Sequence, residues 1–310
     1  MEPSDLYHVR QQFTLGAYRS VANATLPEPS SQDYLPLQLY KARALIALGE
    51  PQHVEEFIPE ESETLPLKAA RSLAKYVAAT PERKDSALEE LRDLCVEIEG
   101  EEVSEGDRGE VRVLAGTAFA REGEVEEALE TLGAGSSHEN LEATALIVQI
   151  YLFIDRTDAA KKEYERALKW AEDDLLLQLI EASIGLVTGG EGYSNAFSFY
   201  SEQLGNPSLT SPHLLTARGV TRLLRGEVPE AKSDLEEALK SEENAETFCA
   251  SIVAAGLGTG KKADADQLFS HLSEKFPTHP MVLDIAQKSK AFDELVSKFE
   301  VPPPAVTASA

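Results

Sequence analysis

Apolar and small side chains recur along this chain with the spacing of paired amphipathic helices. In the stretch "LLRGEVPEAKSDLEEALKSEENAET", which runs from residue 223 to 247, three of them fall on one helical face: Ala231, Leu235 and Ala238. The same order of small and large side chains returns 34 positions later (265 − 231 = 34), in Ala265, Phe269 and Leu272. The chain therefore contains at least two copies of one helical hairpin.

Looser copies of this hairpin lie upstream. The segments "EATALIVQIYLFIDRTDAAKKEYERALKWAEDD" and "VRVLAGTAFAREGEVEEALETL" carry small and apolar residues at matching offsets. An interval of about 34 residues is the period of the tetratricopeptide repeat, in which each helical hairpin buries its apolar face against the next. Strand signals are nearly absent. We therefore predict an all-α fold, a tetratricopeptide-like right-handed α-solenoid of about eight to nine helical hairpins.

The array is expected to fill almost the whole chain. Dividing 310 residues by the period leaves room for about nine units. We predict a single solenoid domain over residues 1–299, in which a last helix at about 281–299 forms a C-terminal cap. The ending "VPPPAVTASA" predicts a disordered tail over residues 300–310.

Small residues in the second helix of each unit, and the large apolar residues on the same helical face, are interpreted as packing positions. A side chain larger than alanine or glycine would push the two axes of a hairpin apart where they cross. The predicted packing residues are Ala128, Ala160, Ala231, Leu235, Ala238, Ala265 and Phe269.

The charge balance limits the classes of partner. The chain carries 54 acidic and 29 basic residues, a formal net charge of −25. Nucleic-acid binding depends on Lys and Arg that neutralise phosphates, so this balance argues against it, and adsorption to an anionic membrane is disfavoured for the same reason. A protein partner fits better. The start "MEPSDLYHVR" lacks a signal pattern and no apolar run reaches ~18 residues, so we expect a cytosolic protein.

No constellation of catalytic residues emerges from the sequence. The segment "GLGTGKK" at 256–262 lacks the first glycine and the final Ser or Thr of a phosphate-binding loop, and it falls where a hairpin turn belongs. The six histidines are scattered singly, and Cys95 and Cys249 form no CxxC pair, so they read as buried thiols in a reducing compartment. We predict no metal, no cofactor and no enzymatic activity.

A solenoid of this type lines its concave face with the first helix of each repeat. The face predicted from the repeat register is small, apolar and mildly acidic, which suits a helix or compact segment of another protein. An adaptor for an acidic chaperone tail would need Lys, Arg and Asn at these positions. The predicted protein-binding residues are Glu110, Val113, Thr117, Glu142, Ala145, Gln149, Leu152, His213, Thr216, Val220, Leu223, Thr247, Ala250, Ala254 and Leu257.

Two segments carry a resemblance to a known family. The start "SDLYHVRQQFTLGAYRSVANA" resembles the N-terminus of the epsilon subunit of coatomer, and the stretch from "RGEVPEAKSDLEEALKSEENAETF" to "HPMVLDIAQKSKAFDEL" is similar to that family's C-terminal repeats. The resemblance implies a non-enzymatic structural subunit of the COPI vesicle coat, acting in retrograde Golgi-to-ER and intra-Golgi transport. Its implied partner is the C-terminal region of the alpha subunit of coatomer, with the solenoid curling around a projecting part of it.

The same resemblance implies a cytoplasmic protein that is peripheral on Golgi membranes and COPI-coated vesicles, with membrane contact only indirect through the coat. Two other hypotheses stay open on the residues alone. One is a tetratricopeptide adaptor scaffold of another cytosolic multiprotein complex, such as a cell-cycle or chaperone assembly. The other is an enzyme with an unrecognised site.

Overall fold

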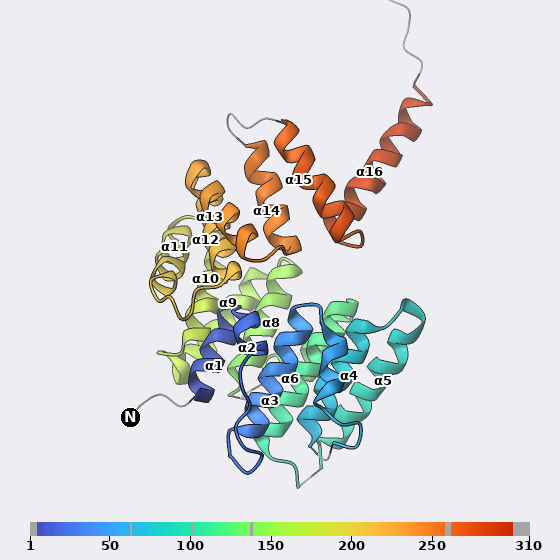
Figure 1. Cartoon of the computed structure of the whole chain (residues 1–310), viewed down its shortest axis with the longest axis vertical. Coiled ribbons are helices and arrows are strands. Elements are labelled where there is room, and N and C mark those ends of the chain that lie inside the picture. Colours follow the sequence, from blue (N-terminus) through green and yellow to red (C-terminus); the bar gives the residue numbers. More distant parts are fainter. Residues whose placement is uncertain (1–4, 63, 101, 137–138, 258–261, 300–310) are drawn as a thin grey trace, which may run out of the picture.

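The computed structural model describes residues 5–299 apart from 63, 101, 137–138 and 258–261, and all its regular elements are helical. The described residues form eight hairpins and a last helix (Figure 1), which confirms the prediction of an all-α solenoid. The helices are α1 (Asp5–Thr14), α2 (Tyr18–Ala22), α3 (Tyr34–Ala47), η1 (Pro51–Glu56), α4 (Leu65–Ala78), η2 (Pro81–Arg83), α5 (Lys84–Glu97), α6 (Glu105–Glu122), α7 (Val125–Leu132), α8 (Leu141–Phe153), α9 (Thr157–Ala171), α10 (Leu175–Thr188), α11 (Glu191–Leu204), α12 (Pro212–Leu224), α13 (Val228–Ser241), α14 (Ala245–Gly256), α15 (Lys262–Lys275) and α16 (Pro280–Val296).

Polar caps and turn glycines set the ends of the first helix in a hairpin. The side chains of Ser104, Asn140 and Asn244 each accept a hydrogen bond from a backbone N–H in the first turn of the helix that follows. Gly123 and Gly226 follow the ends of α6 and α12 with φ of +90° and +81°, a conformation that costs a residue with a Cβ about 1–2 kcal/mol. The chain therefore reverses within a few residues and the second helix packs back on the first.

The two helices of a hairpin approach each other closely because their contact residues are small. A Cβ on Gly116 in α6 would lie 2.6 Å from Leu132 Cγ in α7, and one on Gly219 in α12 would lie 2.9 Å from Leu235 Cγ in α13. Five of the predicted packing residues are buried at 0–1% exposure: Ala128, Ala160, Ala231, Leu235 and Ala238. Ala265 and Phe269 are only half-buried, because no further hairpin covers α15.

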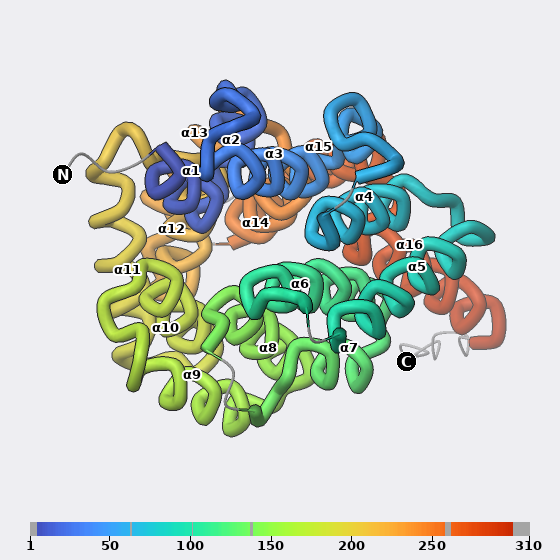
Figure 2. Tube along the Cα trace, turned by 90° about the horizontal axis from the view of Figure 1, so that it is seen from below, coloured from blue at the N-terminus to red at the C-terminus, as the bar shows by residue number. Residues whose placement is uncertain are grey.

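The solenoid curls until its first hairpin meets its sixth and seventh. Figure 2 shows the helices from α1 to α12 following a closed path, in which α1 and α2 return to the side of α10 and α12. We call these seven hairpins, residues 5–241, the ring, and the contact between α1–α2 and α10–α12 the seam. The eighth hairpin, α14–α15, lies beyond one end of the ring (Figure 1).

The last helix departs from the regular stacking. The expected capping helix at about 281–299 is α16, which begins at Pro280 and ends at Val296, but none of its residues is buried. It projects away from α15 (Figure 1) and makes only sparse contact with the rest of the described chain. The predicted tail at 300–310 lies outside the described residues.

Overpacking the crossing of α12 and α13 tests the packing interpretation. Ala231 is fully buried, so Ala231→Leu is expected to lower the free energy of unfolding by ~1–3 kcal/mol. The matched control is Ser233→Leu, which adds a larger side chain at an exposed position of the same helix. Urea denaturation of both variants measures the difference, and equal stability of the two would contradict the interpretation.

Candidate functional site

The seam is held by hydrogen bonds between residues almost 200 positions apart. Ser211 is buried, and its Oγ donates to the carbonyl oxygen of Leu15 at 2.6 Å while accepting from Leu214 N at 3.0 Å. One hydroxyl therefore both caps α12 and binds the end of the first helix. Gln12 Nε2 adds a hydrogen bond to the Ser208 carbonyl oxygen at 3.2 Å.

Apolar and aromatic contacts complete the seam. The Leu15 side chain is buried in a cluster formed by residues of α10, α11 and α12. The rings of Tyr18 and His213 meet edge to face, with centroids 5.0 Å apart. Gly16, at φ +74°, passes so close to His213 that a Cβ there would lie 2.6 Å from His213 Cβ. The closure of the ring thus depends on a glycine at this position.

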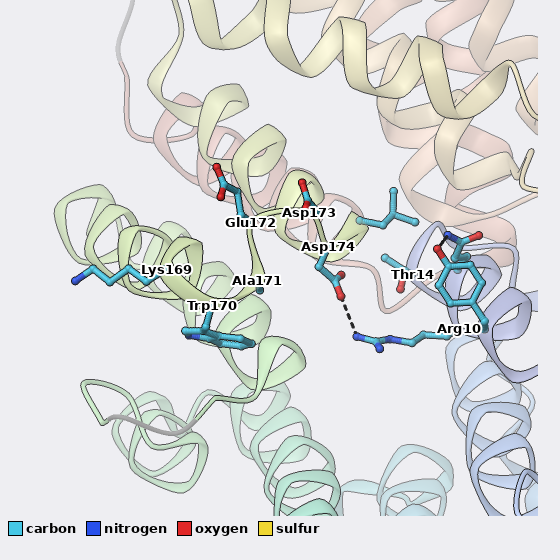
Figure 3. Close-up of a pocket in the computed structure, with 11 residues that line it drawn as sticks. Arg10, Thr14, Lys169, Trp170, Ala171, Glu172, Asp173 and Asp174 are labelled. Carbon is cyan, nitrogen blue, oxygen red and sulfur yellow. Dashed lines mark hydrogen bonds and ion pairs between the residues drawn. The ribbon is translucent and has the colours of Figure 1, made fainter. Parts of the chain in front are cut away.

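A pocket of about 640 Å³ opens next to the seam (Figure 3). Its walls are α1 on one side and the turn between α9 and α10 on the other, and Arg10 reaches across to pair with Asp174 at 3.3 Å. Trp170, Glu172 and Asp173 line the opposite wall (Figure 3). This pocket is polar and exposed, and the ion pair that crosses it is a weak one in water.

A second pocket, of about 300 Å³, lies inside the ring. Its twelve lining residues come from six helices distributed around the ring, so we call it the lumen pocket. They are Phe13, Thr14, Tyr18, Arg43, Val113, Thr117, Glu142, Ala145, Leu146, Gln149, Leu176 and Leu179. The structure thereby brings together five residues of the predicted concave face, Val113, Thr117, Glu142, Ala145 and Gln149.

Arg43 is the charged centre of the lumen pocket. Its side chain is 10% exposed, and its guanidinium pairs with Glu142 and, at 3.4 Å, with Glu110. It also lies 4.6 Å from the centre of the Phe13 ring, a cation–π contact. Tyr40 Oη donates to Glu142 Oε1 at 3.0 Å. One cation therefore links side chains of α1, α3, α6 and α8.

The two carboxylates of this group respond differently to their surroundings. Burial raises the pKa of Glu110, and Arg43 offsets this only in part. Burial also opposes the charge of Glu142, but the charge of Arg43 and the hydrogen bonds from Arg43 and Tyr40 hold its pKa below the ordinary value. Glu142 therefore stays charged as the partner of Arg43. Its role is to fix the inner wall of the ring.

Other predicted concave-face residues lie elsewhere. Thr216 and Thr247 are buried and share a hydrogen bond of 2.6 Å between their hydroxyls, which joins α12 to α14. Ala250 and Ala254 are buried against Leu235, and Val220 and Leu223 pack half-buried on the same cluster. Because Thr216, Thr247, Ala250 and Ala254 are buried between hairpins, we leave these four out of the binding surface, whereas Val220 and Leu223 remain partly exposed. His213 lies in the seam, Leu152 is half-buried, and Leu257 is exposed.

The sequence analysis missed the aromatic and basic side of the lumen. Phe13, Tyr18 and Arg43 come from the first two hairpins, whose inner residues were not assigned. Arg43 lies within the apolar stretch "YLPLQLYKARALIA", and a buried cation in such a helix requires acidic partners. The position of Arg43 in this apolar stretch therefore indicates, from the sequence alone, that acidic side chains must lie nearby. The identity of the partners, 67 and 99 positions away, depends on the curvature of the array.

The described residues contain no group of three or more His, Cys, Asp or Glu placed to hold a metal ion. Within the same residues, no helix is both long and apolar enough to cross a membrane. Cys95 and Cys249 are free thiols that are half-buried, where the sequence had suggested buried ones.

Comparison with known proteins gives a match over nearly the whole chain. The family model for the coatomer epsilon subunit matches residues 2–300. The chain is 30% identical to coatomer subunit epsilon-1 of Arabidopsis thaliana, over 96% of this chain and 98% of that protein. It is 27% identical to a probable coatomer subunit epsilon of Schizosaccharomyces pombe, over 96% of each.

Solved structures share the fold at low identity. A tetratricopeptide repeat protein from Parabacteroides merdae superposes with a TM-score of 0.56 at 14% identity, over 81% of this chain and 96% of that one. The Cut9–Hcn1 assembly of the APC/C gives a TM-score of 0.60 at 12% identity, over 91% of this chain and 54% of the other. These likenesses concern the repeat architecture alone.

The first prediction from the site concerns Gly16. Gly16→Ala places a Cβ against His213, whereas Gly49→Ala, at a nearly equal φ of +75°, meets nothing within 4 Å. Both variants bear the cost of a left-handed alanine, about 1–2 kcal/mol, but only Gly16→Ala should also loosen the seam. Amide hydrogen exchange in α1 and α2 is expected to accelerate in Gly16→Ala alone, and identical exchange in the two variants would contradict the role of the seam.

The second prediction concerns pH. Burial lowers the pKa of His213 below its ordinary 6.5, although Glu242 and Glu246 act in the opposite direction. The unfolded chain therefore binds this proton more readily, so stability is lost as the pH falls below about 6.5. His213→Phe should lose less Tm than the wild type between about pH 7.5 and 5.5. The exposed His271→Phe serves as the control and should follow the wild type.

Proposed function

Because the chain belongs to the coatomer epsilon subunit family, we propose that it binds and stabilises the C-terminal region of the alpha subunit of coatomer. Through this contact it supports retrograde Golgi-to-ER and intra-Golgi vesicle transport. Membership of the family itself gives the chain a structural role in the heteromeric COPI coat, as a scaffold and not as an enzyme. It also implies a cytoplasmic location associated with the Golgi and with vesicles.

The observation that carries the proposal is the closed ring with a pocket inside it. A ring whose ends meet at the seam surrounds a bound segment from several sides, and side chains from six helices are available to contact it. Such a clamp suits a projecting and compact part of a partner better than a flat surface. Many separate contacts around the lumen would give specificity without a single dominant anchor.

The lumen pocket offers both apolar and polar contacts. Leu146, Leu176 and Leu179 supply apolar surface, while Thr117 and Gln149 supply groups that can form hydrogen bonds. Because Arg43, Glu110 and Glu142 already satisfy one another, they shape the wall at little cost on binding. We propose that the alpha subunit, bound in the lumen, attaches the chain to the coat. The chain would then contact the membrane only indirectly.

Filling the lumen tests the proposal. Gln149 is exposed on the lumen wall and is not tied to Arg43, so Gln149→Trp should block the pocket without removing the ion pairs of the ring. We expect the Kd for the purified C-terminal region of the alpha subunit to rise by about tenfold or more in isothermal titration calorimetry. Gln52→Trp, at an exposed position of η1 outside the lumen pocket, is the matched control. Unchanged affinity for Gln149→Trp would remove the lumen from the interface.

Partner binding should also stabilise the folded ring. A ligand that binds only the native state adds about 2.7 kcal/mol when its free concentration is 100 times its Kd. The melting temperature of the chain is therefore expected to rise when the alpha-subunit region is added in excess, and to stay constant with an unrelated protein of the same concentration. No rise with the alpha-subunit region would count against direct binding.

A further inference from the structure

Apolar packing across the seam is confined to one end of the first hairpin. Three buried side chains of that hairpin, Val9, Val21 and Ala22, belong to the core cluster that continues through α3 as far as α8. Among the described residues of the hairpin, Leu15 is the buried side chain that belongs to the cluster of α10–α12. The first hairpin is therefore built into the core on the side of α3, and it contacts α10–α12 through much less apolar surface.

Most polar contacts across the seam are open to water. The hydrogen bond from Gln12 to the Ser208 carbonyl oxygen is exposed, and the side chains of the Arg10–Asp174 ion pair are 46% and 33% exposed. Such contacts add little stability, because water replaces them when they part. The Ser211 hydroxyl supplies a buried hydrogen bond. Parting the seam thus costs few contacts, whereas parting the first hairpin from α3 would expose an apolar core.

The seam also separates two pockets that share a wall. Thr14 lines both the pocket of about 640 Å³ next to the seam, which we call the seam pocket, and the lumen pocket. Across from it, Leu175 lines the seam pocket and the next residue, Leu176, lines the lumen pocket. One side chain of α1 and the first turn of α10 therefore lie between the two pockets. Separation of α1 from α10 would join them.

Opening at the seam requires no break elsewhere in the core. Three buried clusters overlap along the ring, one from α1 to α8, one from α8 to α10 and one over α10–α12. In a solenoid each hairpin contacts its neighbours, so small changes of angle at several junctions add up. A slight uncurling therefore moves α1–α2 away from α10–α12 while the contacts between neighbouring hairpins are kept.

Entry along the axis of the ring is obstructed at one end. Figure 1 shows α14 and α15 beyond that end, and Figure 2, turned by 90°, shows α14 behind the interior of the closed path. The hydrogen bond between the hydroxyls of Thr216 and Thr247 fixes α14 to α12. A bound segment must therefore enter from the other end or through the seam. The seam route admits a segment sideways, so that no folded part next to it has to pass through the lumen.

We propose that the seam is a gate, which opens between α1–α2 and α10–α12 to admit the C-terminal region of the alpha subunit and closes behind it. This inference rests on the proposed function, but it concerns the route into the lumen and not what the lumen binds. The seam is closed in the free chain and again in the complex. Its contacts therefore slow association and dissociation by the same factor and leave the affinity unchanged.

Two neighbouring glutamines of α1 test the gate by kinetics. Gln12 Nε2 donates across the seam to the Ser208 carbonyl oxygen, whereas Gln11 Nε2 donates to Tyr7 Oη within the same helix. Gln12→Ala should raise the association and dissociation rate constants for the purified alpha-subunit region by about two- to tenfold each, the effect of one hydrogen bond, with Kd unchanged. Gln11→Ala should keep the wild-type rates. Stopped-flow mixing measures them, and wild-type rates in Gln12→Ala would overturn the gate.

A reversible crosslink tests the gate directly. Arg10 and Asp173 lie on opposite walls of the seam pocket (Figure 3), so a thiol-cleavable bismaleimide can bridge the variant Arg10→Cys/Asp173→Cys. Cys95→Ser and Cys249→Ser remove the two native thiols from it. We expect the bridged chain to lose association with the alpha-subunit region and to regain it after cleavage. A complex that is bridged after assembly should no longer dissociate.

The control is Arg10→Cys alone in the same background, which carries the reagent without a bridge and should bind at its unmodified rate. Equal association of the bridged and the cleaved chain would overturn the gate and leave the lumen proposal in place, because the partner would then enter along the axis. If the cleaved double variant or the modified control does not bind, the two glutamine variants decide. Absence of binding by the wild type would overturn the proposed function and the gate together.

Discussion

The whole architecture depends on how closely two helices of a hairpin can approach. At Gly116 and Gly219 there is no room for a Cβ against the leucine of the facing helix, and Ala128 and Ala231 are fully buried in those facing helices. Close-packed interiors transmit such distances, because they resist both voids and overlap. The spacing within each pair therefore sets the angle to the next pair, and seven pairs add up to a curve that returns to its origin.

The contact across the seam closes the curved array of hairpins into a ring with an enclosed lumen. The seam involves few groups, chiefly the Ser211 hydroxyl, the Leu15 side chain and the edge-to-face contact between the rings of Tyr18 and His213. Its effect on the inside is larger, since it brings Phe13 and Tyr18 beside Arg43 and opposite α6 and α8. A scaffold of this form can surround part of another polypeptide, which is the task that the coatomer epsilon family membership suggests for it.

The sequence revealed the local structure more readily than the closed form. The 34-residue period and the caps before several helices are local signals, and small residues marked by that period, such as Ala128 and Ala231, are buried where the helices of a hairpin meet. The lumen was only partly predictable. Glu142, Ala145 and Gln149 follow from the register, but Arg43 faces them across 99 to 106 positions of sequence, and that meeting depends on the summed curvature of several hairpins. Thr216 and Thr247 were predicted to lie in the binding groove. They are instead buried, because α12 of the seventh hairpin packs against α14 of the eighth at these two residues.

The central claim is that the inside of the ring holds the alpha subunit. The most direct measurement is photo-crosslinking from single sites on the assembled complex, with a benzophenone side chain placed at Thr117 in the lumen pocket or at the exposed Glu126 on α7. The account predicts a crosslink from Thr117 to the C-terminal region of the alpha subunit and none from Glu126. Crosslinks from Glu126 with none from Thr117 would contradict it, because the partner would then lie on the outside of the ring.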